Sequence, residues 1–298
     1  MKRIALALAL ALLALWYAAT ASAAGALLHS ERSQYREVLV YEDAGSRCLC
    51  FTHECAIGRQ SCIELAQPDH MVFEYTRLML GALFLVPDPH QILVIGLGGG
   101  TLPRALARLL PMAHIDVVEI DPAVVRVATQ YFGFQQSPQL TVSTEDGRAY
   151  VRRLLREGTR KYDLIMLDAY EREYIPEHLL TREFLRQVAE LLRPGGVVAA
   201  NTWSSSRLYP NESVTYHAVF GDFYNLKSGN RIILASSGAL PTLDEIRRNS
   251  ERFNEAFTPL GFTPSVLLPL FSTQADWDPA ARVLTDQYSP ANLLNAAH

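Results

Sequence analysis

Three carboxylates with the chemistry of a ligand site occur in the middle of the chain: Glu119, Asp146 and Asp168. Each ends a stretch that the sequence predicts to be a strand, and three such strands follow one another. The carboxyl ends of parallel strands meet at one edge of a sheet, where ligands bind. Carboxylates there could hold a sugar diol, accept from the amine of a base, or deprotonate an amine. Because buried strands rarely end in charge without a partner, the pattern predicts a binding site.

A glycine cluster favours a nucleotide-like ligand at the same edge. Residues 92–95 form an apolar run typical of a buried parallel strand, and four of the next five residues are glycine. Residues 102–110 then show helical spacing. Strand, glycine turn and helix open a nucleotide-binding α/β unit, in which glycine lets a ligand approach the backbone. We assign Gly96 and Gly98 to the binding site.

Glu119 lies 23 residues beyond Gly96, near the usual offset of about 20 residues for the acid that holds ribose hydroxyls. The third glycine of the dinucleotide fingerprint would fall at Thr101. Its absence favours S-adenosylmethionine or a derivative over NAD. The alternative for Glu119 is an exposed carboxylate at a strand end. Asp121, which precedes Pro122, is predicted to be a helix N-cap.

Asp146 and Asp168 each permit two interpretations. Asp146 could accept from the exocyclic amine of a base, or it could cap the helix predicted at 147–156. Asp168 could face a cationic substrate, with Glu171 as a second acid. Two acids attract a diamine or deprotonate an amine. Glu171 could instead belong to a solvated loop.

Composition and the order of elements indicate the fold class. The chain has 298 residues, 49% of them hydrophobic, and its net charge of −4 indicates no nucleic-acid surface. Further strands are predicted at 115–121, 140–145, 162–168, 196–203 and 231–236, with helices between them. This alternation predicts a Rossmann-like α/β fold with a mostly parallel sheet. No G-x-S-x-G or H-E-x-x-H motif occurs, and the eight histidines are interpreted as surface or core residues, so we predict no metal site.

The N-terminus has the pattern of an export signal. Lys2 and Arg3 precede an apolar run to about residue 19, and Ala21-Ser22-Ala23 matches a signal-peptidase site. We therefore predict a signal peptide at 1–23 and an exported, periplasmic protein. The alternative is an uncleaved segment that anchors the chain to the membrane, although the run is marginal for spanning.

All four cysteines lie between residues 48 and 62. In an oxidising compartment such a cluster predicts two disulfides, and spacing does not decide the pairing. A zinc site with His53 is the alternative. Short strands predicted at 35–41, 47–51 and 61–65 form an N-terminal antiparallel β domain, residues 25–70. The catalytic domain, residues 71–298, then begins with an apolar helix at 72–85.

Taken together, these motifs resemble the spermidine synthases, the polyamine aminopropyltransferases. The segments that carry the resemblance are Val94-Ile-Gly-Leu-Gly-Gly-Gly-Thr101, Val117-Val-Glu-Ile-Asp121, Glu145-Asp-Gly147, Tyr162-Asp-Leu-Ile-Met-Leu-Asp-Ala-Tyr170 and Leu180-Thr-Arg-Glu-Phe184. Class I methyltransferases share several of them. The preceding β domain, Phe73-Glu-Tyr75 and Leu180-Thr-Arg-Glu-Phe184 narrow the resemblance to the spermidine synthases. The export signal and the departures described below indicate a divergent, exported branch of that family.

The resemblance implies an activity and a role for each site residue. The family transfers an aminopropyl group from decarboxylated S-adenosylmethionine to a di- or polyamine such as putrescine, with no tightly bound cofactor. Glu119 would hold the ribose and Asp146 the adenine. Asp168 would orient and deprotonate the attacking amine. Tyr75 would line the amine channel, and Glu171 occupies the place of the family's second acid. In-line placement and an unprotonated amine are what this chemistry requires.

Several positions depart from the family pattern. The family has an aspartate where this chain has Gly99, and a glutamine where it has Arg36. Thr76 and Arg77 follow Tyr75, and a late Tyr-Pro-Ser-Gly motif is replaced at residues 226–229, which begin with Leu226. Two alternative functions therefore stay open. One is a methyltransferase, and the other is an exported polyamine- or nucleoside-binding protein without catalysis. Neither the acceptor amine nor the oligomeric state follows from the sequence, and a homodimer stays open.

Overall fold

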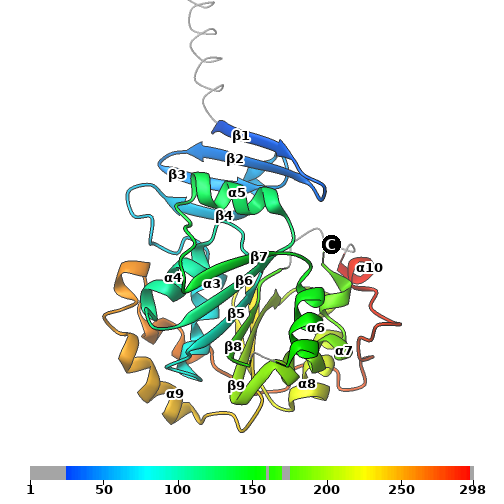
Figure 1. The fold of residues 1–298 in the computed structure, drawn as a ribbon. Helices are drawn as coiled ribbons and strands as arrows, with labels where there is room; N and C mark the ends of the chain where they lie inside the picture. Colours follow the sequence, from blue (N-terminus) through cyan, green and yellow to red (C-terminus); the bar gives the residue numbers. More distant parts are fainter. Residues whose placement is uncertain (1–24, 159–160, 170–174, 296–298) are drawn as a thin grey trace, which may run out of the picture.

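The computed structural model describes residues 25–158, 161–169 and 175–295. The described chain contains a four-stranded sheet near the N-terminus and a larger, seven-stranded sheet. In Figure 1 the smaller sheet lies above the larger one, with a helix between them. The predicted leader, residues 1–23, lies outside the described residues, and the domain boundary predicted near residue 70 stays a prediction. Within the described ranges, no helix is both long and apolar enough to cross a bilayer.

The smaller sheet is antiparallel and follows chain order. Its strands are β1 (Ala26–Arg32), β2 (Glu37–Asp43), β3 (Ser46–Cys50) and β4 (Arg59–Glu64), with the one-turn helix α2 (Cys55–Gly58) before β4. Strand β1 was not predicted, because this edge strand has exposed or half-buried residues and shows no regular apolar alternation.

The two predicted disulfides are confirmed. Cys48 and Cys62, which face each other on β3 and β4, form one bond, and Cys50 and Cys55 form the other. All four thiols are used in these bonds, which leaves no thiolate for the zinc alternative.

The larger sheet has the strand order β10-β11-β9-β8-β5-β6-β7. Its parallel strands are β5 (Gln91–Ile95), β6 (His114–Glu119), β7 (Leu140–Thr144), β8 (Tyr162–Leu167) and β9 (Leu192–Trp203). The antiparallel strands β10 (Tyr224–Lys227) and β11 (Asn230–Ser236) extend one side, and the sequence analysis missed β10. The predicted α/β class is confirmed. From β5 the chain proceeds to β6 on one side and later to β8 on the other, which makes this point the topological switch where such folds bind ligands.

Helices cover both faces of this sheet (Figure 1). On one face the apolar core includes side chains of α3 (Glu74–Met79), η2 (Leu80–Phe84), α4 (Thr101–Leu109) and α9 (Leu243–Ser250). On the other it includes α6 (Gly147–Glu157), α7 (Arg182–Leu191) and α8 (Tyr209–Phe220). Helix α5 (Pro122–Tyr131) packs Val124 and Val127 against the smaller sheet. The two sheets are thereby joined through a shared apolar layer.

The predicted helix at 72–85 is interrupted, because this apolar stretch divides into α3 and the 3-10 helix η2. Helix α9 ends at Ser250. The 3-10 turns η4 (Glu251–Phe253) and η5 (Thr258–Leu260) follow it. The last part of the chain contains η6 (Pro264–Val266), η7 (Leu268–Leu270) and α10 (Ala291–Asn295). The 3-10 helix η3 (Glu177–Leu179) precedes α7 and borders the site described next.

Candidate functional site

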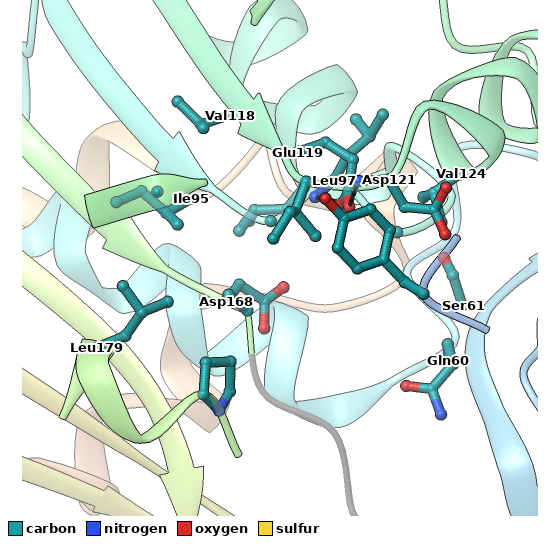
Figure 2. Close-up of a pocket in the computed structure, with 18 of the residues that line it drawn as sticks. Gln60, Ser61, Ile95, Leu97, Val118, Glu119, Asp121, Val124, Asp168 and Leu179 are labelled. Carbon is teal, nitrogen blue, oxygen red and sulfur yellow. Dashed lines mark hydrogen bonds between the residues drawn. The ribbon is translucent and has the colours of Figure 1, made fainter. Parts of the chain in front are cut away.

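A pocket of about 250 Å³ lies at the carboxyl ends of β5, β6 and β8. It brings together six of the predicted site residues: Tyr75, Gly96, Gly98, Glu119, Asp146 and Asp168. The seventh, Glu171, lies outside the described residues. Figure 2 shows Glu119 and Asp168 near the end of the sheet, while Gln60 and Ser61 approach from β4. Six of the seven predicted residues thus line one cavity, which residues of both sheets border.

The glycine turn forms one wall of this pocket. Gly98 has a φ of +53°, and a Cβ added there would come no closer than 3.8 Å to another group, the Ser61 Cβ. Its backbone is therefore open to a ligand on the pocket side. The turn is joined to both neighbouring strands, because the Gly96 amide donates to the Val118 carbonyl and the Asp168 amide donates to the Ile95 carbonyl.

Glu119 lies at the end of β6 with both carboxylate oxygens engaged. The Leu97 amide donates to Oε2 at 3.0 Å, and the Asp121 amide donates to Oε1 at 2.9 Å. Burial raises the pKa of Glu119, and these two backbone hydrogen bonds oppose that rise. A carboxylate offers about four lone-pair positions. One on each oxygen therefore stays available to a vicinal diol. Asp121 is the predicted N-cap of α5 and accepts from the Ala123 amide.

Asp146 is the N-cap of α6, which was one of its two interpretations, and its role toward a base stays a prediction. Its Oδ1 accepts from the Ala149 amide at 2.8 Å and caps α6, while the carboxyl also lines the pocket. Its Oδ2 lies 2.7 Å from Nε2 of His178, which is on η3. The hydrogen bond from His178 lowers the pKa of Asp146. His178 was not predicted as a site residue, because no spacing pattern links a histidine to a carboxylate so far along the chain.

Asp168 follows β8 and points into the pocket (Figure 2). Its Oδ1 accepts from Nδ2 of Asn201 at 2.9 Å, and the hydroxyl of Tyr75 donates to the same carboxyl. Burial raises the pKa of Asp168 to about 7, and the hydrogen bonds from Asn201 and Tyr75 oppose that rise. A carboxyl with such a pKa exchanges protons near neutrality, as a general base must. Asn201 is a further residue that the sequence analysis missed.

The smaller sheet supplies pocket residues that the sequence analysis did not assign to a site, among them Gln60 and Ser61. Ser61 explains the absence of a side chain at residue 99. A Cβ added to Gly99 would lie 2.7 Å from Ser61 Oγ and 3.1 Å from the Phe132 ring. Arg36 also lines the pocket, with its guanidinium 4.4 Å from the centre of the Phe51 ring. Its charge opposes the rise in the pKa of Glu119.

The other departures from the family pattern have structural roles here. Arg77 donates from Nε to the Met71 carbonyl at 2.8 Å, and Thr76 donates from its hydroxyl to the Phe73 carbonyl at 2.7 Å. Both bonds fasten the loop that precedes α3. The Leu226 side chain is fully buried in the main apolar core.

Comparison with known proteins places this geometry in a family. The profile of the "Spermine/spermidine synthase domain" matches residues 72–224. A polyamine aminopropyltransferase of Vibrio vulnificus is 45% identical over 273 residues, which cover 90% of this chain and 91% of that protein.

Solved structures show the same fold. A probable spermidine synthase from Corynebacterium glutamicum superposes with a TM-score of 0.63 at 20% identity, covering 85% of this chain and 97% of that one. Human methyltransferase-like protein 13, solved with SAH, superposes with a TM-score of 0.55 at 28% identity, covering 70% and 96%. The matched profile and the identity across nearly the whole chain establish that this protein belongs to the spermine/spermidine synthase family.

Proposed function

We propose that this protein is a polyamine aminopropyltransferase that uses decarboxylated S-adenosylmethionine as its co-substrate and a di- or polyamine as acceptor. The observation that carries the proposal is Asp168, a pocket carboxyl whose pKa is raised to about 7 and which Tyr75 and Asn201 hold in place. Membership of the spermine/spermidine synthase family supports the same activity.

The nucleoside half of the donor fits the end of the pocket that Glu119 and Asp146 form. Glu119 accepts one backbone amide on each oxygen, so a second lone pair on each oxygen would accept from the ribose hydroxyls. Asp146, fixed by the Ala149 amide and by His178, would accept from the exocyclic amine of adenine. The open backbone at Gly98 leaves room for the donor beside the glycine turn.

The acceptor amine would lie against Asp168. Its nitrogen must be unprotonated to attack the carbon bound to the sulfonium, and Asp168 in its carboxylate form accepts the proton. A carbon–nitrogen bond forms and the carbon–sulfur bond breaks, with its electron pair going to sulfur, so that neutral methylthioadenosine leaves. Placement of the amine in line with the leaving sulfur supplies most of the rate enhancement. We assign Tyr75 to the wall of the amine site and Glu171 to the second acid there.

The test is release of methylthioadenosine by purified protein. We expect release from decarboxylated S-adenosylmethionine that depends on putrescine, cadaverine or spermidine, and the most active amine identifies the acceptor. Folded protein that shows no amine-dependent release would overturn the proposal. In that case, methyl transfer from S-adenosylmethionine would identify a methyltransferase, and binding without turnover a binding protein.

Two variants separate the two halves of the site. Glu119→Gln should weaken methylthioadenosine binding at least tenfold, because an amide accepts through only one of its two polar atoms. Asp168→Asn should abolish turnover and leave methylthioadenosine affinity unchanged. Unchanged affinity in Glu119→Gln would contradict the assignment of Glu119 to the ribose. Full activity in Asp168→Asn would contradict the assignment of Asp168 as the base.

We also propose that the chain is exported, with residues 1–23 as a cleaved leader, residues 25–70 as the β domain and residues 71–298 as the catalytic domain. The charged and apolar pattern at the N-terminus supports export, and two disulfides are typical of proteins outside the cytoplasm. Cell fractionation and the intact mass of the mature chain test this. Recovery from the cytoplasm with the leader retained would contradict it.

A further inference from the structure

A row of three polar side chains crosses the edge of the larger sheet beside the pocket. Asp168 follows β8, Asn201 is near the end of β9, and Asn230 begins β11, which is the next strand in the sheet. Nδ2 of Asn230 donates to Oδ1 of Asn201 at 2.9 Å, and Nδ2 of Asn201 donates to Oδ1 of Asp168 at 2.9 Å. The two hydrogen bonds run in one direction, toward the carboxyl.

The register of β9 and β11 places Asn201 and Asn230 on the same face of the sheet. Asn230 pairs with Trp203 and Ile232 pairs with Asn201, so residues 201, 203, 230 and 232 share one face of the sheet. Asn201 is only 5% exposed, so its amide has little access to bulk water. The Ser204 hydroxyl donates to the carbonyls of Ser228 and Gly229, and this contact holds the β10–β11 turn against the end of β9.

The hydrogen bond from Asn230 decides which end of the Asn201 amide faces Asp168. An asparagine amide has a donating end and an accepting end, and its hydrogen-bond network determines which way it points. Asn230 donates to the oxygen of Asn201, which leaves the nitrogen for Asp168. In the opposite orientation, Oδ1 of Asn201 would face Oδ1 of Asp168, and the two oxygens could not form a hydrogen bond.

We propose, resting on the function proposed above, that Asn201 and Asn230 are positioning residues that hold Asp168 in the carboxylate form needed to accept the proton of the acceptor amine. Burial favours the neutral acid, and the hydrogen bond from Asn201 opposes it. Asn230 does not touch Asp168 in this row and acts through the orientation of Asn201. Loss of a hydrogen bond to a charged group raises the pKa of an acid by roughly one to two pH units.

Other titratable groups near Asp168 also influence its protonation. Tyr75 on α3 donates to Asp168, and the pocket is also lined by Arg36, Glu119, Asp146 and His178. Among the described residues, only Asn201 and Tyr75 form side-chain hydrogen bonds with the Asp168 carboxyl. The neighbouring Thr202 and Arg231 belong to the opposite face of the sheet, where Arg231 is fully buried against Asn225 and Ser213.

Two variants of equal charge test the row. Asn201→Asp removes the donor and places a second acid beside Asp168. Asn230→Asp removes only the outer donor, so that the Asn201 nitrogen turns toward residue 230 and its oxygen toward Asp168. Each should move the acidic limb of the pH profile of kcat/KM for the amine upward by about one pH unit. Methylthioadenosine affinity should not change.

The matched control is Asn254→Asp, which adds the same charge at an exposed residue beyond α9. It should leave the profile unchanged. The ionisation of the free amine contributes equally to all four proteins, so a difference between profiles reports the enzyme group. A folded Asn230→Asp variant with an unshifted limb would overturn the role of Asn230, and the same result for Asn201→Asp would overturn the whole inference. Wild-type protein without amine-dependent release would instead refute the proposed function.

Discussion

Gly96, at the end of β5, packs directly against the main chain of Asp168, at the end of β8. A Cβ built on Gly96 would lie 2.2 Å from the Asp168 carbonyl oxygen, and Gly96 has a φ of +106°. No other residue type satisfies both conditions without moving one strand end. The glycine therefore sets the distance between the turn that would face the nucleoside and the carboxyl that would face the amine.

Replacement of Gly96 by alanine should consequently destabilise the protein by more than about 2 kcal/mol, because strain in φ adds to a clash with backbone. Gly133→Ala is the matched control, since Gly133 has a φ of +66° and no atom within 4 Å of an added Cβ. It should cost only about 1 kcal/mol, from strain alone. Thermal and denaturant unfolding of both variants give the difference. Equal losses would show that the contact with Asp168 has no energetic consequence.

The raised pKa of Asp168 predicts how stability depends on pH. In the unfolded chain this group ionises near its ordinary value of 3.8, and in the folded protein only near 7. Between these values the folded state binds more protons, so wild-type stability falls as pH rises from about 4 to 7. Asp168→Asn does not titrate. Its melting temperature relative to wild type should therefore rise across this interval and stay constant above it.

Asp163 supplies a control of opposite sign. Burial would raise its pKa, but hydrogen bonds from the Gln91 amide at 2.8 Å, from Arg193 at 2.8 Å and from the His90 amide at 2.9 Å lower it. This contribution to stability is present above the ordinary pKa of an aspartate and is lost in acid. Asp163→Asn should thus be less stable than wild type at pH 7, with the deficit shrinking toward pH 3. The same trend in both aspartate variants would contradict the assignments.

Ser61 on β4 occupies the space that a side chain at residue 99 would need. Gly99→Asp should destabilise the protein by about 1–3 kcal/mol, because the new atoms would meet Ser61 and Phe132. The double variant Gly99→Asp with Ser61→Gly should recover part of that loss, since the closest contact, with Ser61 Oγ at 2.7 Å, is removed. Urea unfolding of the two single variants and the double variant measures this coupling. Strict additivity would show that the two positions do not compete for space.

The two disulfides should differ in how much they stabilise the protein and in how much they affect ligand binding. Cys48–Cys62 closes a longer loop, with a sequence separation of 14 against 5 for Cys50–Cys55. Chain entropy then predicts a loss of about 3 kcal/mol on removing the first and about 2 kcal/mol on removing the second.

Cys62 of the first bond directly follows two residues that line the pocket, Gln60 and Ser61, whereas Cys50 of the second bond adjoins one, Phe51. Serine replacement of the pair Cys48 and Cys62 should weaken methylthioadenosine binding more than serine replacement of Cys50 and Cys55. Titration of the two folded variants is the measurement, and the reverse order of affinities would contradict the prediction.

Much of the fold and part of the site followed from local patterns. The apolar run at 92–95, the glycines after it and the acids at the ends of the next strands each depend on a few consecutive residues. A parallel sheet brings such strand ends to one edge whatever the details of packing, which is why Glu119, Asp146 and Asp168 line one pocket. The cap at Asp121 and the two disulfides were also predictable, because capping and cysteine clustering are properties of short segments.

Weakly patterned elements escaped sequence analysis. Strand β1 has no buried face that would impose an apolar alternation, and β10 has only four residues, three of them buried in succession. Their pairing is stabilised by neighbouring strands that the local sequence does not identify.

The sequence by itself determined the residue types of the site: glycines that admit a ligand, and carboxylates that suit a diol and an amine. Only the tertiary structure decided what surrounds them. His178 meets Asp146, Ser61 meets Gly99, and Asn230 meets Asn201 because elements distant in the chain are neighbours in space. These contacts depend on strand order and sheet packing, which arise from the burial of the whole core. The orientation and proton affinity of the carboxyls are therefore properties of the folded protein.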